Sequence, residues 1–228
     1  MTETSPMGTF GKYITRYEHK AMTVDERFAN IKVAGLATPG VELKIVNSED
    51  FTQTLPNDGV AQGELLVRGP WITAEYYNIK KPEAFVKGWL ATGDVASITR
   101  NGDLIIRDRS KDVIKSGGEW ISSIDLEKVI AGIPGVGQVA VVAQPHPKWD
   151  ERPVCVIVPA EDAEVSGLTT QHIRHVCSAS FAKYELPDEV LLWKELPMTG
   201  TGKVDKKNIR KRLEKEGYRL PSLRNAKL

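Results

Sequence analysis

The chain has 228 residues, of which 41% are hydrophobic and 27% are charged, and its net charge is +1. This composition is ordinary for a globular protein, and the length suffices for one large or two small domains. The balanced charge gives no reason to expect a nucleic acid or a membrane surface as a partner, and no apolar run is long enough to span a bilayer.

Short strands separated by turns are expected over residues 36–107. Residues 41–46 alternate between apolar and polar side chains, which is typical of a half-buried strand. Residues 64–68 form another apolar run, and residues 89–94 resemble a strand that ends in a turn. The hairpin signal Asn101-Gly102-Asp103 joins two further runs. This stretch therefore predicts antiparallel β structure.

A charged joint follows the β-rich stretch. The segment from Arg107 to Asp112 is polar throughout, carries charges of both signs and offers no apolar anchor. A short strand is expected at Val113-Ile114, and Ser116-Gly117-Gly118-Glu119 predicts a turn because adjacent glycines permit positive φ. We expect the joint to link the β-rich part to a second compact unit.

Helices and strands alternate in this second unit. Apolar side chains after Ser122 and Ser123 recur at i, i+3, i+4 and i+7, which predicts a capped helix over residues 122–133. The other expected elements are helices after Thr169 or Thr170 and after Asp205, and strands at 136–143, 154–158 and 190–193. The fold class is therefore α+β, with a β-rich part followed by a small mixed α/β domain.

The cysteines and histidines give no metal-site signal. Cys155 and Cys177 fall inside an expected strand and helix, where we expect buried free thiols, because free cysteine packs as a small hydrophobe. The four histidines are scattered without the spacing of metal ligands.

The order of motifs resembles that of the adenylate-forming (AMP-binding) enzymes, which include acyl-CoA synthetases, peptide-synthetase adenylation domains and luciferases. Each motif is weak alone, but together they follow the family order over nearly the whole chain. The motifs are Met1-Thr2-Glu3, Gly63-Glu64-Leu65 to Tyr77, Thr92-Gly93-Asp94, Asp108-Arg109-Ser110-Lys111-Asp112, Tyr184-Glu185-Leu186-Pro187 and Thr201-Gly202-Lys203. Residues 115–123 and 145–149 look most like medium- and long-chain fatty acyl-CoA synthetases.

The resemblance implies a domain organisation and a reaction. Residues 1–107 would be the C-terminal remnant of the large adenylation domain, 108–112 the hinge, and 109–228 the mobile C-terminal domain. ATP, with Mg²⁺, and a fatty acid would give an acyl-adenylate and pyrophosphate. The C-terminal domain would then rotate about Lys111, and the CoA thiol would attack the adenylate to form the thioester.

The resemblance also implies a nucleotide site. Glu3 would hold Mg²⁺ as a hard carboxylate ligand, and Thr2 would bond a phosphate oxygen. Asp94 would accept hydrogen bonds from both ribose hydroxyls, which one carboxylate can do, and Arg109 would also face the ribose. Without the family context, Glu3 would be a solvated terminal turn and Asp94 a turn cap.

Lysines and an aromatic side chain near the hinge are further candidates. Lys111 and Lys115 would meet nucleotide phosphates as point charges, although alone they would be a solvated charge run. Trp120 would border the nucleotide or acyl channel, or it is simply a half-buried aromatic after a turn. The sequence leaves both roles of Trp120 open.

Two glycine-containing loops carry the remaining roles. Gly117 and Gly118 would let the backbone approach the pantetheine arm of CoA. Lys203, on a glycine-flanked loop, would stabilise negative charge that develops on the α-phosphate during adenylation. Gly202-Lys203 is not a P-loop, because residue 197 is proline where that loop needs glycine and Val204 replaces the Ser/Thr.

In this family the phosphate-gripping loop, the acyl tunnel and most of the large domain precede the Thr-Glu turn. We therefore expect the 228-residue chain alone to have little or no ligase activity, which pyrophosphate exchange by the purified chain would test. Two alternatives remain open. One is a ligase for an aryl or short-chain acid, and the other is a non-catalytic truncated paralogue.

The last residues, Ala226-Lys227-Leu228, resemble the small-basic-Leu address that a peroxisomal import receptor recognises. In a eukaryotic source this predicts the peroxisomal matrix, and otherwise the cytoplasm. A fluorescent fusion that stays diffuse with the tail intact would contradict the peroxisomal prediction.

Overall fold

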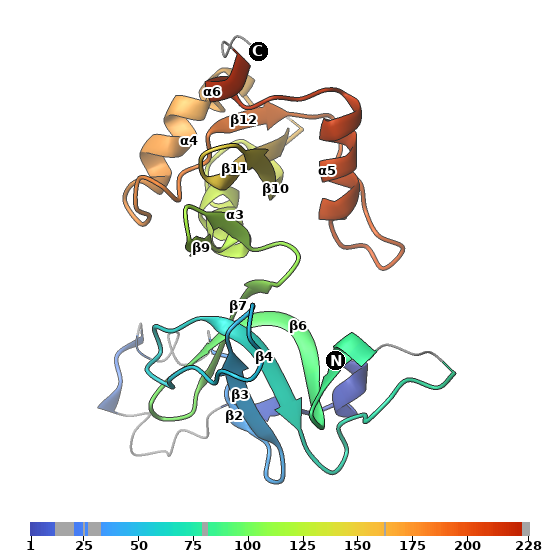
Figure 1. Cartoon of the computed structure of the whole chain (residues 1–228). Helices are drawn as coiled ribbons and strands as arrows, with labels where there is room; N and C mark the ends of the chain where they lie inside the picture. The colour runs from blue at the N-terminus through green and yellow to red at the C-terminus, as the bar shows by residue number, and fades with distance from the viewer. Residues whose placement is uncertain (12–20, 25, 27–32, 79–81, 162, 225–228) are drawn as a thin grey trace. The chain divides into compact units, whose positions relative to one another are not determined.

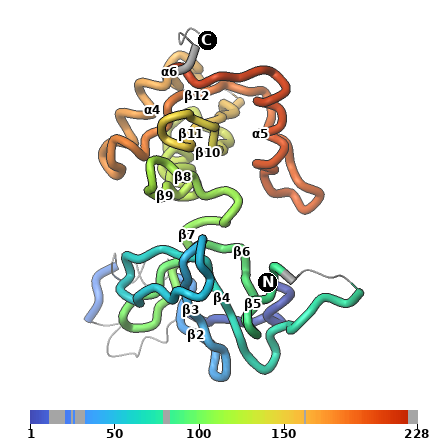
Figure 2. Tube along the Cα trace, viewed as in Figure 1, coloured from blue at the N-terminus to red at the C-terminus, as the bar shows by residue number. Residues whose placement is uncertain are grey.

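A computed structural model describes residues 1–11, 21–24, 26, 33–78, 82–161 and 163–224. The chain forms two compact units, Met1–Lys111 and Asp112–Leu228, which are described separately (Figures 1 and 2). The predicted import address at residues 226–228 lies outside the described residues.

The first unit is built on antiparallel sheets. A five-stranded sheet has the order β3-β4-β6-β5, with β7 also paired to β6, and a separate two-stranded sheet joins β1 and β2. The elements are η1 Thr2–Thr4, β1 Thr9–Phe10, β2 Leu36–Ala37, β3 Glu42–Val46, β4 Gly63–Arg68, η2 Pro82–Ala84, β5 Phe85–Val86, β6 Trp89–Ile98 and β7 Leu104–Arg109.

Alternating apolar residues of these strands form the core of the first unit. Ile45, Leu65 and Ile98 belong to one buried cluster, as the period-2 pattern of half-buried strands requires. The antiparallel β structure predicted for residues 36–107 is confirmed. The turn predicted at residues 92–94 is wrong, because β6 runs through it, with a positive φ of 72° at Gly93 and a register shift near Val95.

The second unit is a five-stranded sheet covered by helices. Its strand order is β10-β11-β8-β9, and β12 pairs in parallel with β11. The elements are β8 Ile114–Ser116, β9 Glu119–Ile121, α3 Ser123–Ala131, β10 Val136–His146, β11 Asp150–Pro159, η3 Val165–Gly167, α4 Thr170–Cys177, β12 Glu189–Leu192, α5 Lys206–Lys215 and α6 Pro221–Arg224.

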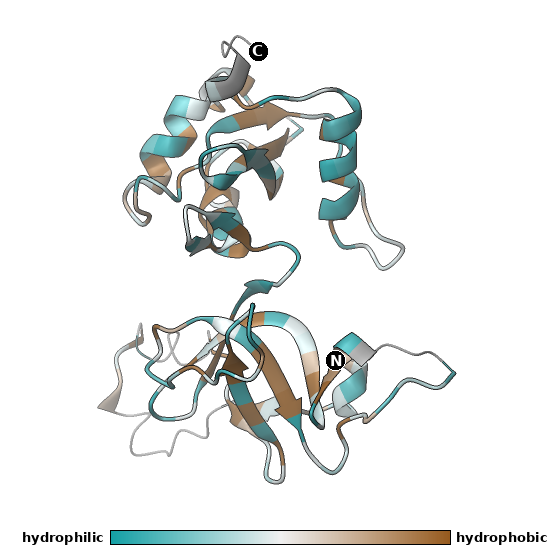
Figure 3. Ribbon diagram, in the orientation of Figure 1, coloured by the Kyte–Doolittle hydropathy of each residue, from teal (hydrophilic) through white to brown (hydrophobic). Residues whose placement is uncertain are grey.

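The two longest strands of this sheet, β10 and β11, are buried on both faces, which explains their nearly continuous apolar sequence. Val141 belongs to the cluster formed with α3 and α4, whereas its neighbours Ala140 and Val142 belong to the cluster formed with α5. Successive side chains on a strand point to opposite faces, so α5 covers the face opposite to α3 and α4 (Figures 1 and 3).

Side-chain caps start the three longer helices where the sequence predicts them. Ser122 accepts a hydrogen bond from the backbone N–H of Asp125, and Thr169 accepts one from that of His172. Asp205 accepts one from the backbone N–H of Asn208. Each cap satisfies an N–H that the first helical turn would otherwise leave unpaired, so these boundaries follow from the sequence.

Both cysteines are buried free thiols, as expected. Burial raises the pKa of the Cys155 thiol well above its usual value and also raises the pKa of Cys177. Both thiols therefore stay protonated and unreactive in the folded unit. Among the described helices, none has both the length and the apolarity needed to cross a bilayer.

Candidate functional site

Asp94 and Arg109 face each other across the β6–β7 pair. They are register partners, and Nε of Arg109 lies 2.9 Å from Oδ1 of Asp94. Burial raises the pKa of the Asp94 carboxyl, although the Arg109 guanidinium and a hydrogen bond from Thr92 oppose this shift. The Asp94 side chain is 17% exposed, so this oriented carboxylate keeps a surface to which hydroxyl groups can donate.

A cavity of about 200 Å³ opens beside this carboxylate. Its lining includes Thr92 and Asp94 from β6, and Met1 and Thr4 from the first turn. The fold therefore brings the first turn and β6, which lie about ninety residues apart in the sequence, to one cavity, although Thr2 and Glu3 themselves are not among the residues that line it.

The first turn is fixed by hydrogen bonds. The Thr4 hydroxyl donates to the carbonyl oxygens of Met1 and Pro6, both at 2.9 Å, and the backbone N–H of Thr73 donates to the Glu3 carbonyl. The Tyr76 hydroxyl donates to the Glu3 carboxylate at 3.1 Å. Burial and this carboxylate raise the pKa of Tyr76, which therefore remains a donor at neutral pH.

Glu3 fits a Mg²⁺ ion only as one ligand among several. The described residues contain no group of three or more side chains that could hold a metal. Mg²⁺ commonly takes one or two protein carboxylates and completes its shell with nucleotide phosphates and water. A single anchored carboxylate suits that role. Thr2 lies in the same turn with an exposed side chain, as a phosphate-binding hydroxyl requires.

The β8–β9 hairpin carries four of the predicted site residues. Lys115 and Trp120 are cross-strand partners, with Nζ of the lysine 5.9 Å from the indole ring centroid. Trp120 is half-buried, whereas Lys115 is exposed. Gly117 and Gly118 form the turn with φ values of 62° and 89°, which residues other than glycine rarely adopt.

The two glycines differ in their surroundings. A Cβ built on Gly117 would lie 3.0 Å from Cε3 of Trp149, whose carbonyl oxygen accepts a hydrogen bond from the Gly117 N–H at 2.8 Å. A Cβ built on Gly118 would meet nothing within 4 Å. The turn is thus packed on one side and open at Gly118, where a narrow ligand could approach the backbone.

Lys203 lies on a separate loop that precedes α5. An isolated bridge between Met198 and Val204 closes this loop. The Thr199 N–H donates to the Lys203 carbonyl at 2.7 Å, and the Lys203 N–H donates to the Thr199 hydroxyl at 3.1 Å. The backbone is therefore held while the ammonium side chain is exposed and available to a ligand.

Sequence reasoning missed a buried arginine, Arg152, on β11. Its guanidinium donates to both carboxylate oxygens of Asp188, to the Ser116 hydroxyl at 3.0 Å and to the Leu186 carbonyl at 3.2 Å. It also donates to the Tyr184 carbonyl. The signal in the sequence was an arginine within an apolar strand, a residue that is rarely buried without partners.

Comparison with known proteins places these features in a family context. Residues 125–203 match the family described as the AMP-binding enzyme C-terminal domain. The chain is 43% identical over 210 residues to 3-methylmercaptopropionyl-CoA ligase of Ruegeria lacuscaerulensis, covering 92% of this chain and 38% of the relative. It is 39% identical over 212 residues to medium-chain-fatty-acid–CoA ligase of Ectopseudomonas oleovorans, covering 93% and 38%.

The chain is also similar to a plant protein and to a solved structure. The peroxisomal trans-cinnamate:CoA ligase of Petunia hybrida is 39% identical over 185 residues, covering 80% of this chain and 32% of the relative. The crystal structure of ATP-bound MatB from Rhodopseudomonas palustris matches with a TM-score of 0.71 at 28% identity, covering 82% of this chain and 37% of that one. The chain thus spans well under half the length of the proteins that it matches.

Proposed function

The chain belongs to the adenylate-forming (AMP-binding) enzymes, and we propose that it performs the functions of the C-terminal part of an ATP-dependent acid–CoA ligase. The observation that carries this proposal is the oriented Asp94 carboxylate on the wall of a cavity that is also lined by Met1 and Thr4, the residues on either side of Thr2 and Glu3. This arrangement supports a nucleotide site in which Asp94 accepts from the ribose and the first turn, with Thr2 and Glu3, meets the phosphates.

In the adenylation step, Asp94 accepts hydrogen bonds from the ribose hydroxyls and Arg109 orients that carboxylate. Thr2 bonds a phosphate oxygen. Glu3 would hold Mg²⁺, which supplies positive charge to the phosphates when bound. Lys203 presents its ammonium to the α-phosphate, where negative charge develops as the carboxylate attacks. The exposed side chain on a fixed backbone suits a group that acts beyond its own unit.

In the thioester step, the open side of Gly118 admits the pantetheine arm of CoA, while the contact between Gly117 and Trp149 holds the turn in place. Lys115 and Trp120, on the same hairpin, border the nucleotide or the acyl channel. Lys111 is both the pivot between the two steps and a candidate phosphate contact.

The acid is a fatty acid in this proposal, because residues 115–123 and 145–149 resemble fatty acyl-CoA synthetases. An aryl or short-chain acid is the second candidate substrate, because two relatives are named as ligases for 3-methylmercaptopropionate and trans-cinnamate. For location, Ala226-Lys227-Leu228 would direct a eukaryotic protein to the peroxisome, in line with the peroxisomal name of the Petunia relative.

A chimera tests the proposal directly. The region of the Ruegeria relative that precedes the matched residues is joined to this chain, and ATP–pyrophosphate exchange and CoA-thioester formation are measured with a panel of acids. We expect both activities, and we expect Asp94→Asn to abolish them. A folded chimera without either activity, under conditions where the parent ligase works, would favour the non-catalytic alternative instead.

A further inference from the structure

We propose that two side-chain clamps confine the rotation of the C-terminal unit to Lys111, and that one of them couples this rotation to the Lys203 loop. The clamps are Ser110 with Glu64, and Asp112 with Arg210. These four are positioning residues, and only their catalytic consequence rests on the ligase function proposed above.

The first clamp fixes the chain immediately before Lys111. The Ser110 hydroxyl donates to Oε2 of Glu64 at 2.6 Å, and the Ser110 N–H donates to the Gly93 carbonyl at 3.0 Å. Glu64 lies on β4 and is the register partner of Val95 on β6. Ser110, one residue beyond the end of β7, is therefore fastened both to β4 and to β6, the strand that carries Asp94.

The second clamp fixes the chain immediately after Lys111. Oδ1 of Asp112 lies 3.0 Å from a terminal nitrogen of Arg210, and the two side chains are 12% and 26% exposed. Because this pair is largely shielded from water, it is less screened than a surface pair and its loss leaves a charge poorly compensated. Asp112, the first residue of the second unit, is thus tied to α5.

Helix α5 is itself immobilised on the second unit. Ile209 and Leu213 are buried against β10 and β11. Lys206 donates to Ser123 at 2.6 Å and lies 2.7 Å from a carboxylate oxygen of Glu127, both on α3. A residue fastened to α5 therefore moves with the whole second unit.

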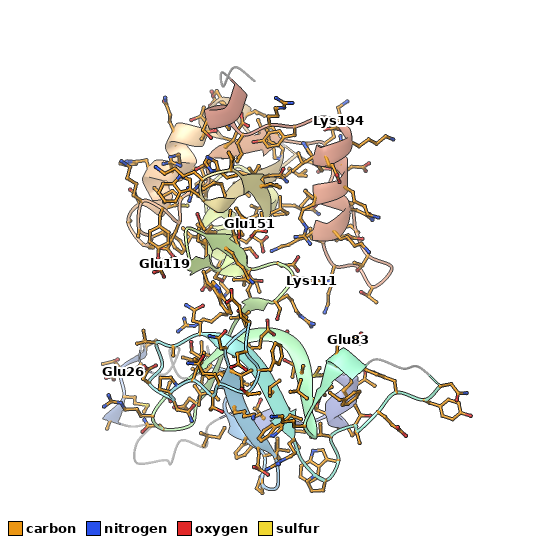
Figure 4. All side chains as sticks on the ribbon, viewed as in Figure 1. Glu26, Glu83, Lys111, Glu119, Glu151 and Lys194 are labelled. Carbon is orange, nitrogen blue, oxygen red and sulfur yellow. The ribbon has the colours of Figure 1, made fainter. Side chains whose placement is uncertain are left out.

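Lys111 stands alone between the two clamps. Its side chain, which is labelled in Figure 4, is exposed. No hydrogen bond or ion pair to another described residue involves this side chain. Since the peptide bonds on either side are planar, the soft degrees of freedom between two fastened neighbours are chiefly the φ and ψ of Lys111.

The second clamp also reaches towards the candidate catalytic lysine. Only two residues separate Lys203 from the start of α5 at Lys206, and the cap residue Asp205 donates its N–H to the Pro197 carbonyl at 2.8 Å. Asp112, α5 and the Lys203 loop therefore move as one rigid body when the chain rotates at Lys111. Without the clamp, residues 112 and 113 would become additional joints.

Distance distributions in the 228-residue chain test the clamps without any activity. Spin labels are placed at Glu49→Cys and Lys194→Cys, which are exposed positions in different units, while the native thiols are fully buried. We expect a broader label-to-label distribution in Ser110→Ala, Asp112→Asn and Arg210→Gln. Asp112→Glu, which keeps the charge, should recover part of the narrow distribution.

The control is Lys211→Gln, which removes a positive charge from the residue next to Arg210 on the same helix. Distributions in the clamp variants that are no broader than in this control would overturn the inference. Ser110→Ala lies outside every helix and strand, so it reports on the first clamp even if an α5 variant proves unstable.

Half-reactions in the chimera separate this inference from the proposed function. Clamp variants should slow overall thioester formation from ATP, acid and CoA about tenfold through kcat, with KM for ATP unchanged, because misplaced groups lose rate rather than ground-state binding. An inactive unsubstituted chimera would count against the proposed ligase function. It would not affect the test of the clamps by distance measurements, which needs no activity. An active chimera whose clamp variants match Lys211→Gln would overturn the catalytic role of the clamps.

Discussion

Oδ1 of Asp94 lies 2.9 Å from Nε of Arg109, on the strand paired with its own. The Arg109 side chain is 56% exposed, so it orients the carboxylate without covering it. The carboxylate is therefore held in place, as its proposed ribose-binding role requires, and the cost of this arrangement is the partial burial of a charge. That cost leads to a prediction in which stability and binding change in opposite directions.

Asp94→Asn should abolish nucleotide binding and raise Tm at neutral pH. The asparagine amide keeps the shape of the side chain but removes the charge whose burial the fold disfavours. It also replaces one of the two accepting oxygens by an NH₂ group, so it cannot accept a hydrogen bond from each ribose hydroxyl on a separate oxygen. Differential scanning calorimetry and titration with AMP measure the two effects. A variant that binds AMP like the parent would refute the ribose role.

The sign of the pH dependence follows from the raised pKa of Asp94. A folded-state carboxyl with a raised pKa binds its proton more tightly than the unfolded chain does, so its ionisation destabilises the fold as pH rises through that pKa. The Tm advantage of Asp94→Asn should therefore shrink as pH is lowered towards the ordinary range of aspartate. An advantage that grows at low pH would contradict this assignment.

The two glycines of the β8–β9 turn should respond differently to alanine. Each substitution forces a positive φ and should cost on the order of 1 kcal/mol, but only Gly117→Ala also brings a methyl group to within 3.0 Å of Trp149. Urea unfolding should therefore rank Gly117→Ala as the less stable variant. An equal or reversed ranking would mean that the Trp149 contact does not hold the turn.

Arg152→Met should destabilise the second unit by about 3–5 kcal/mol, because the Asp188 carboxylate and two backbone carbonyls lose their buried donor. The matched control is Lys128→Met, which removes an exposed pair with Asp125 and should change stability by less than about 1 kcal/mol. Comparable losses in the two variants, measured by urea unfolding, would contradict the structural role of Arg152.

The elements that could be predicted from sequence are those fixed by local signals. Ser122, Thr169 and Asp205 cap helices where their hydrogen-bonding chemistry indicated, and the alternating strands of the first unit lie where expected. The Thr92-Gly93-Asp94 turn could not be foreseen as strand. Its composition is typical of turns, and only pairing of β6 with strands on both sides keeps it extended.

The contacts around the site depend on long-range packing, which leaves little trace in a single sequence. The bond from Tyr76 to Glu3 joins residues 73 positions apart. Two acceptors of Arg152 are backbone carbonyls, which any residue supplies. The motifs identified the candidate residues, whereas the orientation of Asp94 by Arg109 and the fastening of Ser110 and Asp112 required the fold.

The central claim is that Lys203 and Gly118 serve different steps of one ligase reaction, and a crossed measurement in the chimera tests it most directly. Lys203→Ala should reduce ATP–pyrophosphate exchange by about 100-fold or more, yet still convert a supplied acyl-adenylate and CoA to thioester. Gly118→Ala should do the reverse, and Lys207→Ala, an exposed lysine on α5, should affect neither step. If Lys203→Ala and Gly118→Ala impaired both steps equally, or impaired neither, the account would be contradicted.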